Sequence, residues 1–250
     1  MLPHIEHKAS EPIISFHMFK NRLFAGSTLV ALFYGGTFIS ATIQIPIFVQ
    51  GVYGDSATNS GLVLLPMMLG SVVSAQLGGF LTTKMSYRNI MLISGLVLVS
   101  GFSLLSTLNI DTPRLLLTMY MIVVGLGVGF SFSVLSMAAI HHFGPEQRGS
   151  ATSTSNFMRS LGMTIGASMF GMIQKNQFSE QLEDMFKSSG ASNFASTNDA
   201  DQILSSARAS LPPDVLHNIT EALSNSIVHT FIWAISPAAA AFLLVVLHAE

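Results

Sequence analysis

Cysteine is absent from the 250 residues of this chain, and charged residues make up only 10% of it. The lack of cysteine excludes disulfide bridges, thiolate metal sites and cysteine nucleophiles. A soluble domain carries about 25% charged residues, so this chain has too few charges to cover a folded surface in water. Half of its residues are hydrophobic, and the mean hydropathy is +0.55. The composition therefore predicts a protein embedded in a lipid bilayer.

Features that would serve catalysis, metal binding or nucleic-acid binding are also missing. The formal net charge of −2 offers no basic surface for a nucleic acid. The adjacent histidines His141 and His142 would point apart on a helix, and no carboxylate pair completes a set of ligands, so we expect neither a metal nor another cofactor. No catalytic motif occurs in a suitable context. The chain is therefore not expected to be an enzyme.

Long hydrophobic stretches are plentiful. A helix of roughly 20 apolar residues crosses the hydrocarbon core of a bilayer, and backbone groups in lipid must be hydrogen-bonded internally. The sequence therefore predicts an all-α, polytopic membrane protein with a six-transmembrane-helix bundle. The six predicted spans are residues 23–49, 60–82, 89–108, 115–140, 151–173 and 226–248.

The remaining segments give the predicted domain organisation. Residues 1–22 are predicted to form a cytoplasmic linker or interfacial segment, and residues 23–173 to hold five transmembrane helices. Residues 174–225 are rich in Ser, Asn, Asp and Ala, and are predicted to be an extracellular loop with two or three short amphipathic helices. Residues 226–250 hold the sixth transmembrane helix.

Positive charges in the short connections predict the orientation. If the amino terminus is cytoplasmic, the basic residues Lys20, Arg22, Lys84, Arg88 and Arg148 all lie on the cytoplasmic side. The short connections on the other side then carry few positive charges. This bias predicts that both termini are cytoplasmic.

Arg159 is the most informative single residue. It lies well inside the fifth predicted span, where a charge costs at least ~2.5 kcal/mol on insertion scales, so it should face protein or water. Ser155, Gly162 and Gly166 share a helix face with Arg159, and Asn156 lies beside that face. This polar, glycine-lined stripe favours a cavity or coupling role. The alternative is an arginine that extends to the inner membrane surface as an anchor.

No Asp or Glu lies inside any of the six predicted spans. A proton-coupled carrier usually needs an embedded carboxylate or histidine. His229, near the outer end of the last predicted span, is interpreted as a helix-end residue and not as a proton relay. A proton carrier would then have to lie on sequence outside this chain. Aromatic, methionine and amide side chains are common in the first and fourth predicted spans, and they form soft walls of the kind that hold flat lipophilic cations. Most such residues in any bundle simply pack or face lipid.

The loop between the second and third spans resembles the signature loop of the major facilitator superfamily, Gly-x-Leu-x-Asp-Arg/Lys-x-Gly-x-Arg. Gly79, Leu81, Lys84 and Arg88 match this pattern, whereas Thr83 and Ser86 replace the acid and the second glycine. The copy of this loop in the second half of such transporters is commonly degenerate.

Three further stretches resemble the fourteen-span drug:proton antiporters of the EmrB/QacA type. They are the segment from Ser56 to Pro66, the segment that runs from Pro145 through Arg148 to Gly166, and the opening from Glu11 to Arg22. The resemblance implies the carboxy-terminal half of such a transporter, with its last six spans. It also implies a bacterial plasma-membrane location and proton-driven export of lipophilic, often cationic, drugs.

The resemblance further assigns roles to individual residues. One wall of the substrate cavity would contain Gln44 and several aromatic residues. Lys84 and Arg88 would lie in a cytoplasmic gate loop together with Gly79 and Leu81. Arg159 and Asn156 would orient polar groups within the bundle. The implied aromatic wall residues are Phe33, Tyr34, Phe38, Tyr120 and Phe130.

One bundle cannot provide alternating access alone. The implied partners are the lipid bilayer, drug-like substrates, protons, and an amino-terminal half of six to eight spans on the same or a separate chain. Self-association also fits. A non-transporting membrane subunit or inactive fragment, whose outer loop binds a partner, remains the alternative of a different class.

Overall fold

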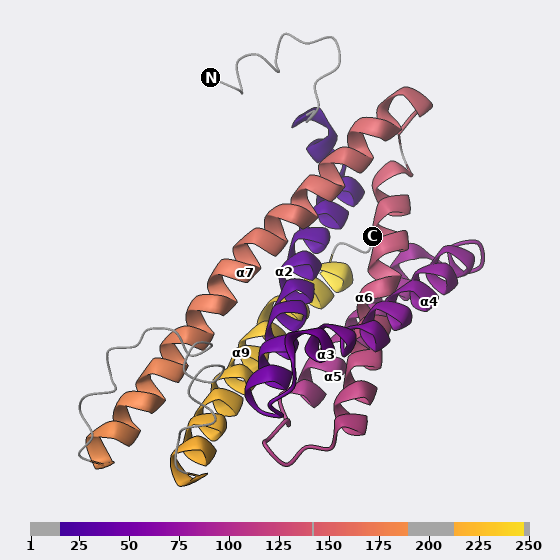
Figure 1. Ribbon diagram of the computed structural model, residues 1–250. Helices are drawn as coiled ribbons and strands as arrows, with labels where there is room; N and C mark the ends of the chain where they lie inside the picture. Colours follow the sequence, from indigo (N-terminus) through magenta and orange to yellow (C-terminus); the bar gives the residue numbers. More distant parts are fainter. Residues whose placement is uncertain (1–15, 142, 190–212, 248–250) are drawn as a thin grey trace.

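The computed structural model of this chain is a bundle of long α-helices (Figure 1), and it describes residues 16–141, 143–189 and 213–247. No strand occurs in these residues, so the predicted all-α class is confirmed. A short 3-10 helix, η1 (Phe16–Lys20), precedes the α-helices. These are α2 (Arg22–Gly51), α3 (Ala57–Leu62), α4 (Leu65–Leu81), α5 (Tyr87–Leu105), α6 (Arg114–Ile140), α7 (Pro145–Ser189) and α9 (Pro213–Leu247).

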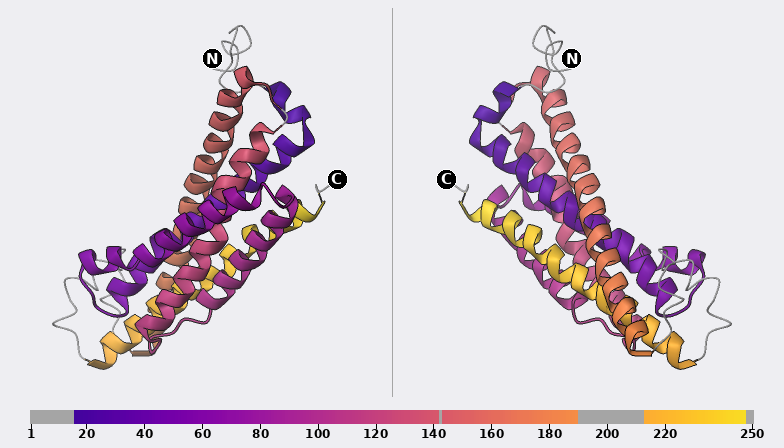
Figure 2. Two further views of the ribbon diagram at one scale, coloured as in Figure 1. Left: turned by 90° about the vertical axis from the view of Figure 1, so that its right-hand side faces the viewer. Right: turned by 90° about the vertical axis from the view of Figure 1, so that its left-hand side faces the viewer.

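Five of the described helical segments are long and apolar enough to cross a membrane. They are Arg22–Gly51, Ala57–Leu81, Tyr87–Leu105, Arg114–Ile140 and Pro213–Val246. They overlap five of the six spans expected from the sequence. The helix α7 is not among them because it is the most polar of the long helices, and the crossing of residues 151–173 stays a prediction. Even so, α7 packs along α2 and extends from one end of the bundle to the other (Figures 1 and 2).

Proline and glycine lie at several positions where the chain turns or a helix begins. Pro66 lies at the start of α4, where its missing N–H costs nothing, and the chain breaks there into α3 and α4. Pro46 and Pro237 lie inside α2 and α9, which remain continuous. Gly54, in the turn after α2, has a φ of 71°, a conformation that favours glycine.

The polar segment between the last two helices differs from the sequence expectation. We expected separate short helices in residues 174–225, but α7 continues to Ser189 and α9 already begins at Pro213. Residues 190–212 lie outside the described part of the chain. The helical extensions are stabilised by packing, because Phe178 of α7 joins Ile219 and Leu223 of α9 in the main hydrophobic core.

The two ends of the bundle can be named by residues that lie there. The Arg22 end holds the start of α2, the turn between α4 and α5, the end of α6 and the end of α9, which together line one pocket. The Asp55 end holds the connections after α2 and α5, where Asp55 forms an ion pair with Arg114 (2.8 Å). Successive long helices therefore run antiparallel, as the short connections predict.

At the Asp55 end, Tyr53 joins the connection after α2 to the connection after α5. The hydroxyl of Tyr53 donates a hydrogen bond to the carbonyl of Thr112 (2.7 Å), and the guanidinium of Arg114 lies 5.3 Å from the Tyr53 ring centre. Burial raises the pKa of Tyr53, and the positive charge of Arg114 offsets part of that rise. The phenol therefore stays protonated at neutral pH and remains a donor.

Close backbone contacts at glycine join two pairs of helices. A Cβ atom on Gly125 or Gly129 of α6 would collide with the backbone of Met67 or Ser71 on α4. A Cβ atom on Gly162 of α7 would collide with the backbone of Leu32 on α2. Small residues at these positions let helices approach closely where lipid supplies no hydrophobic drive between them. The glycine spacing read from the sequence thus marks the α4–α6 and α2–α7 contacts.

At the Arg22 end, η1 packs onto the bundle. Met18 and Phe24 form a small hydrophobic cluster with Ala139 of α6 and Ala151 of α7. The described part of the expected interfacial segment is therefore attached to protein. The rest of that segment, with Ile13 and Ile14, lies outside the described residues.

Candidate substrate-facing site

An aromatic pair joins α2 to α6. Phe38 and Phe132 are both partly buried, and their rings meet edge to face with centroids 5.8 Å apart. Such pairs contribute ~0.5–1.5 kcal/mol beyond their buried area. The pair therefore fixes how α2 and α6 lie relative to each other.

Arg159 of α7 lies over one ring of this pair, that of Phe132. Its guanidinium carbon is 4.7 Å from the centre of the Phe132 ring, a geometry in which the ring face attracts the positive charge. Two of its nitrogens, Nε and Nη2, are buried and have no hydrogen-bond partner among the described residues. We name Phe38, Phe132 and Arg159 the Arg159 cluster. The guanidinium of Arg159 thus holds two N–H donors inside a membrane bundle without acceptors among the described residues. Each such buried donor without an acceptor costs free energy.

The backbone brings Arg159 into this position. A Cβ atom on Gly35 of α2 would collide with the carbonyl oxygen of Arg159, so only glycine permits α7 to lie so close. Gly36 faces Gly162 and Gly166 in the same way. The face that holds Arg159, Gly162 and Gly166 is therefore the face that packs on α2, as the spacing in the sequence indicated.

More unmet polar atoms lie along the same two helices. Gln44 is 1% exposed and donates a long hydrogen bond to the carbonyl of Phe170 (3.5 Å). Its Oε1 atom is buried without a partner in the described residues, and so are the hydroxyls of Ser40 and Ser155. Buried polar groups normally find partners. Among the described residues, unmet side-chain atoms also occur on α9, at Ser224 and His229, so such groups lie along α2, α7 and α9.

The outer face of α7 is half polar. Within residues 151–173, the exposed polar residues are Ser153, Asn156, Ser160, Thr164 and Ser168, and they form a stripe along the helix. An apolar stripe lies beside it and contains Phe157, Leu161, Ile165, Met169 and Met172. We name the first set the α7 polar stripe. Thr164 and Ser168 donate hydrogen bonds to carbonyls of their own helix, which lowers their cost in lipid. Asn156 is exposed and makes no such bond among the described residues.

The other expected wall residues lie in different surroundings. Tyr34 is 2% exposed, and its hydroxyl is hydrogen-bonded to Ser94 of α5 (2.9 Å), so it lies inside the bundle. Phe33 and Tyr120 are partly buried against the main core. Phe130 lies beside Gly78 of α4. Of the expected wall, Phe38 thus packs on Phe132, the ring over which Arg159 lies, whereas Tyr34 bonds to Ser94 inside the bundle.

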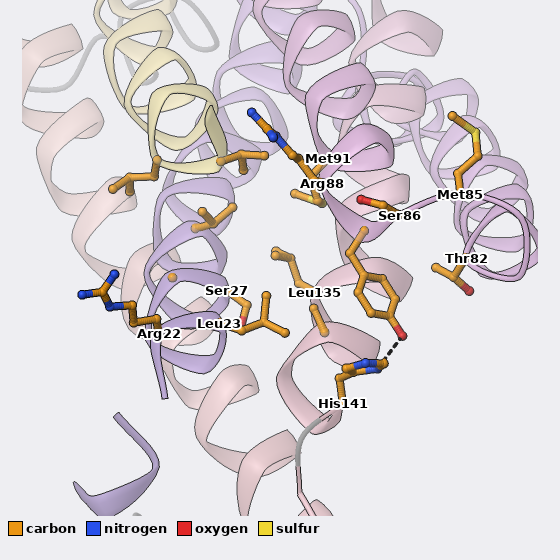
Figure 3. A pocket seen from close by; sticks show the side chains of 16 residues that line it. Arg22, Leu23, Ser27, Thr82, Met85, Ser86, Arg88, Met91, Leu135 and His141 are labelled. Carbon is orange, nitrogen blue, oxygen red and sulfur yellow. Dashed lines mark hydrogen bonds between the residues drawn. The ribbon is translucent and has the colours of Figure 1, made fainter. Parts of the chain in front are cut away.

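The expected gate-loop residues lie at the Arg22 end. Leu81 packs against the core, whereas nothing lies near Gly79 where a side chain would begin. The ammonium of exposed Lys84 is 4.8 Å from the ring centre of Phe80. Arg88 lines a pocket between α2, α5, α6 and α9 (Figure 3).

Two features were not singled out from the sequence. Phe132 was one of several aromatics in its span, and only the fold shows that Arg159 lies over it. Ser94 connects Tyr34 to the carbonyl of Gly127 (2.7 Å), which links α2, α5 and α6. A serine in the middle of an apolar span was the available signal for that link.

Comparison with known proteins supports a family assignment. The sequence pattern of the Major Facilitator Superfamily matches residues 3–167. Multidrug resistance protein 3 of Bacillus subtilis (strain 168) is 46% identical over 238 residues, which cover 93% of this chain and 46% of that protein. Multidrug transporter protein MdtP of the same organism is 36% identical over 180 residues, 72% of this chain and 33% of that protein. The chain thus spans half or less of the length of these curated relatives.

A solved structure shows the same fold. The bacterial homologue of the human lysosomal transporter Spinster, in its inward-facing and unoccupied conformation, superposes with a TM-score of 0.68 at 18% sequence identity. The superposition covers 95% of this chain and 51% of that protein. With its bundle of membrane-crossing helices and its matching sequence pattern, this chain is a multi-pass membrane protein that belongs to the Major Facilitator Superfamily, a family of transporters and not of enzymes.

Proposed function

We propose that this chain is the carboxy-terminal half of a multidrug exporter of the EmrB/QacA type. In this proposal its six spans lie in the bacterial plasma membrane with both termini in the cytoplasm. The exported compounds are lipophilic and often cationic, and the proton gradient drives their export. The similarity to two proteins named for multidrug resistance and multidrug transport supports this assignment.

The observation that carries the proposal is the Arg159 cluster beside the α7 polar stripe. A helix that faced only lipid would not expose five polar residues, so this face of α7 is suited to a water-filled path or to another protein segment. Phe38 and Phe132 add an aromatic surface next to it, which suits flat apolar compounds. Together they form one wall of a translocation path.

The same cluster predicts a partner. Because Nε and Nη2 of Arg159 lack acceptors in the described residues, we expect the amino-terminal half to supply a carboxylate or carbonyl oxygen there. That acceptor would also reduce repulsion between Arg159 and a cationic drug. No Asp or Glu lies in α2 to α6 or in the predicted spans 151–173 and 226–248, so in this proposal the proton-carrying group comes from the other half as well.

Ethidium efflux from cells tests the proposal directly. We expect efflux when this chain is produced with an amino-terminal half, and none when it is produced alone, because one bundle cannot alternate access. The variant Arg159→Ala should abolish efflux without changing the membrane level of the protein. Arg148→Ala is the matched control, because Arg148 is an exposed arginine in the first turns of the same helix.

Three outcomes would contradict the proposal. Unchanged efflux in Arg159→Ala would remove the role of the cluster. Efflux by this chain alone would favour self-association. An absence of efflux in both arrangements would favour a non-transporting subunit that binds a partner through its outer loop.

A further inference from the structure

A pocket of about 380 Å³ lies between α2, α5, α6 and α9 at the Arg22 end of the bundle (Figure 3). None of the described residues that line it belongs to α7, so the pocket is separate from the Arg159 cluster. Its volume falls within the range of ~300–1,000 Å³ that is usual for small-molecule sites. The pocket is therefore large enough to hold part of an organic molecule.

The pocket is closed on its inner side. Along α2 its lining runs from Arg22 to Val30, a distance of ~12 Å at 1.5 Å per residue. One turn beyond Val30, the hydroxyl of Tyr34 is hydrogen-bonded to Ser94 of α5 (2.9 Å). The hydroxyl of Ser94 also donates to the carbonyl of Gly127 on α6 (2.7 Å). The pocket is thus a slot that runs inward from the Arg22 end and stops where these bonds join α2, α5 and α6.

The inner walls of the slot are aliphatic. Val30, Met91 and Leu135 are 3%, 4% and 2% exposed, so they lie behind the outer surface of the bundle. Among the described residues, α9 contributes only Leu244 and Val245 to the lining. A flat aromatic ligand favours stacking on rings, whereas lipid tails are as apolar as leucine and pack on such side chains equally well. The walls therefore suit a flexible hydrocarbon chain.

The polar side chains of the lining already have partners. Ser27 and Thr82 donate hydrogen bonds to carbonyls one turn earlier in the chain. The hydroxyl of Tyr87 is hydrogen-bonded to Nδ1 of His141 (3.2 Å). These groups gain little from a polar ligand, because a new hydrogen bond would replace an existing one.

The two arginines of the lining do not converge. Figure 3 shows the guanidinium groups of Arg22 and Arg88 on opposite sides of the pocket, and the side chain of Asn21 already caps the start of α2. A ligand recognised by its headgroup would need donors that meet at one point. Recognition in this pocket therefore depends on the apolar walls.

We propose that this pocket holds one acyl chain of a membrane phospholipid and that the headgroup of the lipid is not recognised. The helices α2, α5, α6 and α9 all begin or end near the mouth of the pocket, where membrane-crossing helices leave the hydrocarbon core. The headgroup stays at that surface while the chain lies against Leu23, Met91 and Leu135. A free fatty acid carries the same hydrocarbon, so the experiment compares the two sources.

The test is photolabelling of the full chain in phosphatidylcholine vesicles that contain a phosphatidylcholine with a diazirine near the middle of one acyl chain. Peptide mass spectrometry then locates the labelled residues. Met91 and Leu96 lie on the same helix, but Met91 is a buried residue of the pocket wall and Leu96 is 60% exposed. We expect label at Leu96 from the surrounding lipid, and label at Met91 and Leu135 from the chain in the pocket.

Two variants fill the slot from different helices. Ala138→Phe on α6 and Leu244→Trp on α9 should each lower the labelling of Met91 by at least ~tenfold, because a close-packed interior has no room for a second group. Met137→Phe is the matched control, because Met137 is 38% exposed and does not line the pocket. Label at Leu96 should stay the same in all three variants.

Changing the lipid tests which part of it is recognised. Phosphatidylglycerol with the same diazirine chain should label Met91 as strongly as phosphatidylcholine does, and a clear preference for either headgroup would contradict the proposal. If a diazirine fatty acid labels Met91 and neither phospholipid does, the ligand is a free alkyl compound and the assignment to a phospholipid is wrong.

The unaltered chain alone can overturn the proposal. Label at Leu96 without label at Met91 or Leu135 would show that no acyl chain enters the pocket, whether or not any variant folds. Full labelling of Met91 in both filling variants would show that the label arrives by another route. An equal loss in Met137→Phe would show that the loss does not come from filling the pocket.

Discussion

The helices α4 and α7 are attached to the bundle in the same way but differ on their outer faces. Each is held by a close backbone contact at glycine, α4 on Gly125 and Gly129 of α6 and α7 on Gly35 of α2. In α4, every exposed residue except Gln76 is apolar. In residues 151–173 of α7, half of the exposed residues are polar. The inner contacts therefore do not determine what lies outside each helix.

This difference separates two kinds of surroundings. The outer face of α4 has the composition of a surface that meets lipid or an apolar neighbour. The α7 polar stripe would leave Asn156 unsatisfied in hydrocarbon, so it fits water or another polar protein surface. Because the chain spans 46% of Multidrug resistance protein 3, a missing half is the natural neighbour for α7 under the proposed function.

A charge placed on each outer face should give the largest effect. Leu69 is 65% exposed near the middle of the α3–α4 span, and Leu69→Arg should cost about 3 kcal/mol of insertion free energy. Thr164→Arg, on the α7 polar stripe, should cost much less because that face is already polar. The measurement is the amount of folded protein in membranes, by fluorescence-detected size exclusion. Equal losses in both variants would remove the distinction between α4 and α7.

The glycine contacts should give the next effect. Gly162→Leu forces a side chain into the backbone of Leu32 and should lower the free energy of unfolding by about 2 kcal/mol or more. Gly171→Leu, on the same helix, meets nothing within 4 Å and should be neutral or slightly stabilising. Thermal unfolding in detergent compares the two. Tolerance of Gly162→Leu would mean that α7 is not held against α2.

Cysteine labelling tests the surroundings directly, because the chain has no cysteine of its own. Maleimides react with thiolates, which form in water and not in lipid. Ser160→Cys on the α7 polar stripe should therefore react at least ~tenfold faster than Val73→Cys on the outer face of α4. Similar rates in membranes where this chain is produced together with an amino-terminal half would show that the stripe faces lipid.

The smallest effect should come from the ring beneath Arg159. Phe132→Leu keeps an apolar side chain but removes the face on which the guanidinium lies. We expect a loss of about 1 kcal/mol in the free energy of unfolding. Phe130→Leu is the control on the same helix, two residues away. If the two variants lose the same amount, the contact between Arg159 and Phe132 contributes only ordinary packing.

The sequence predicted the membrane helices well and the directions of their side chains poorly. The long apolar runs and the connections between them located α2, α5 and α6 within a few residues. The polar extension of α7 to Ser189 and the early start of α9 were not predicted as continuous helices, because their composition is typical of a loop and only contact between Phe178, Ile219 and Leu223 holds them. For the site, the spacing of Arg159, Gly162 and Gly166 predicted their common face.

Tyr34 and Phe38 show why the rest could not be predicted. Both are aromatic residues in the same apolar helix, four positions apart, yet Tyr34 is bonded to Ser94 inside the bundle and Phe38 lies with Phe132. In a soluble protein the change from apolar to polar residues would indicate which side of a helix is buried. Lipid is as apolar as a protein core, so that signal is absent here.

The amino-acid sequence by itself therefore determined that the chain resides in lipid, where α2, α5 and α6 begin and end to within a few residues, and which glycines allow close approach. These follow from length, composition and spacing, which are local properties. Only the tertiary structure decided that Arg159 lies over Phe132 with two donors that find no acceptor among the described residues, and that Arg22 and Arg88 line one pocket. Those facts depend on which helices are neighbours, and contacts between residues far apart in the sequence set that arrangement.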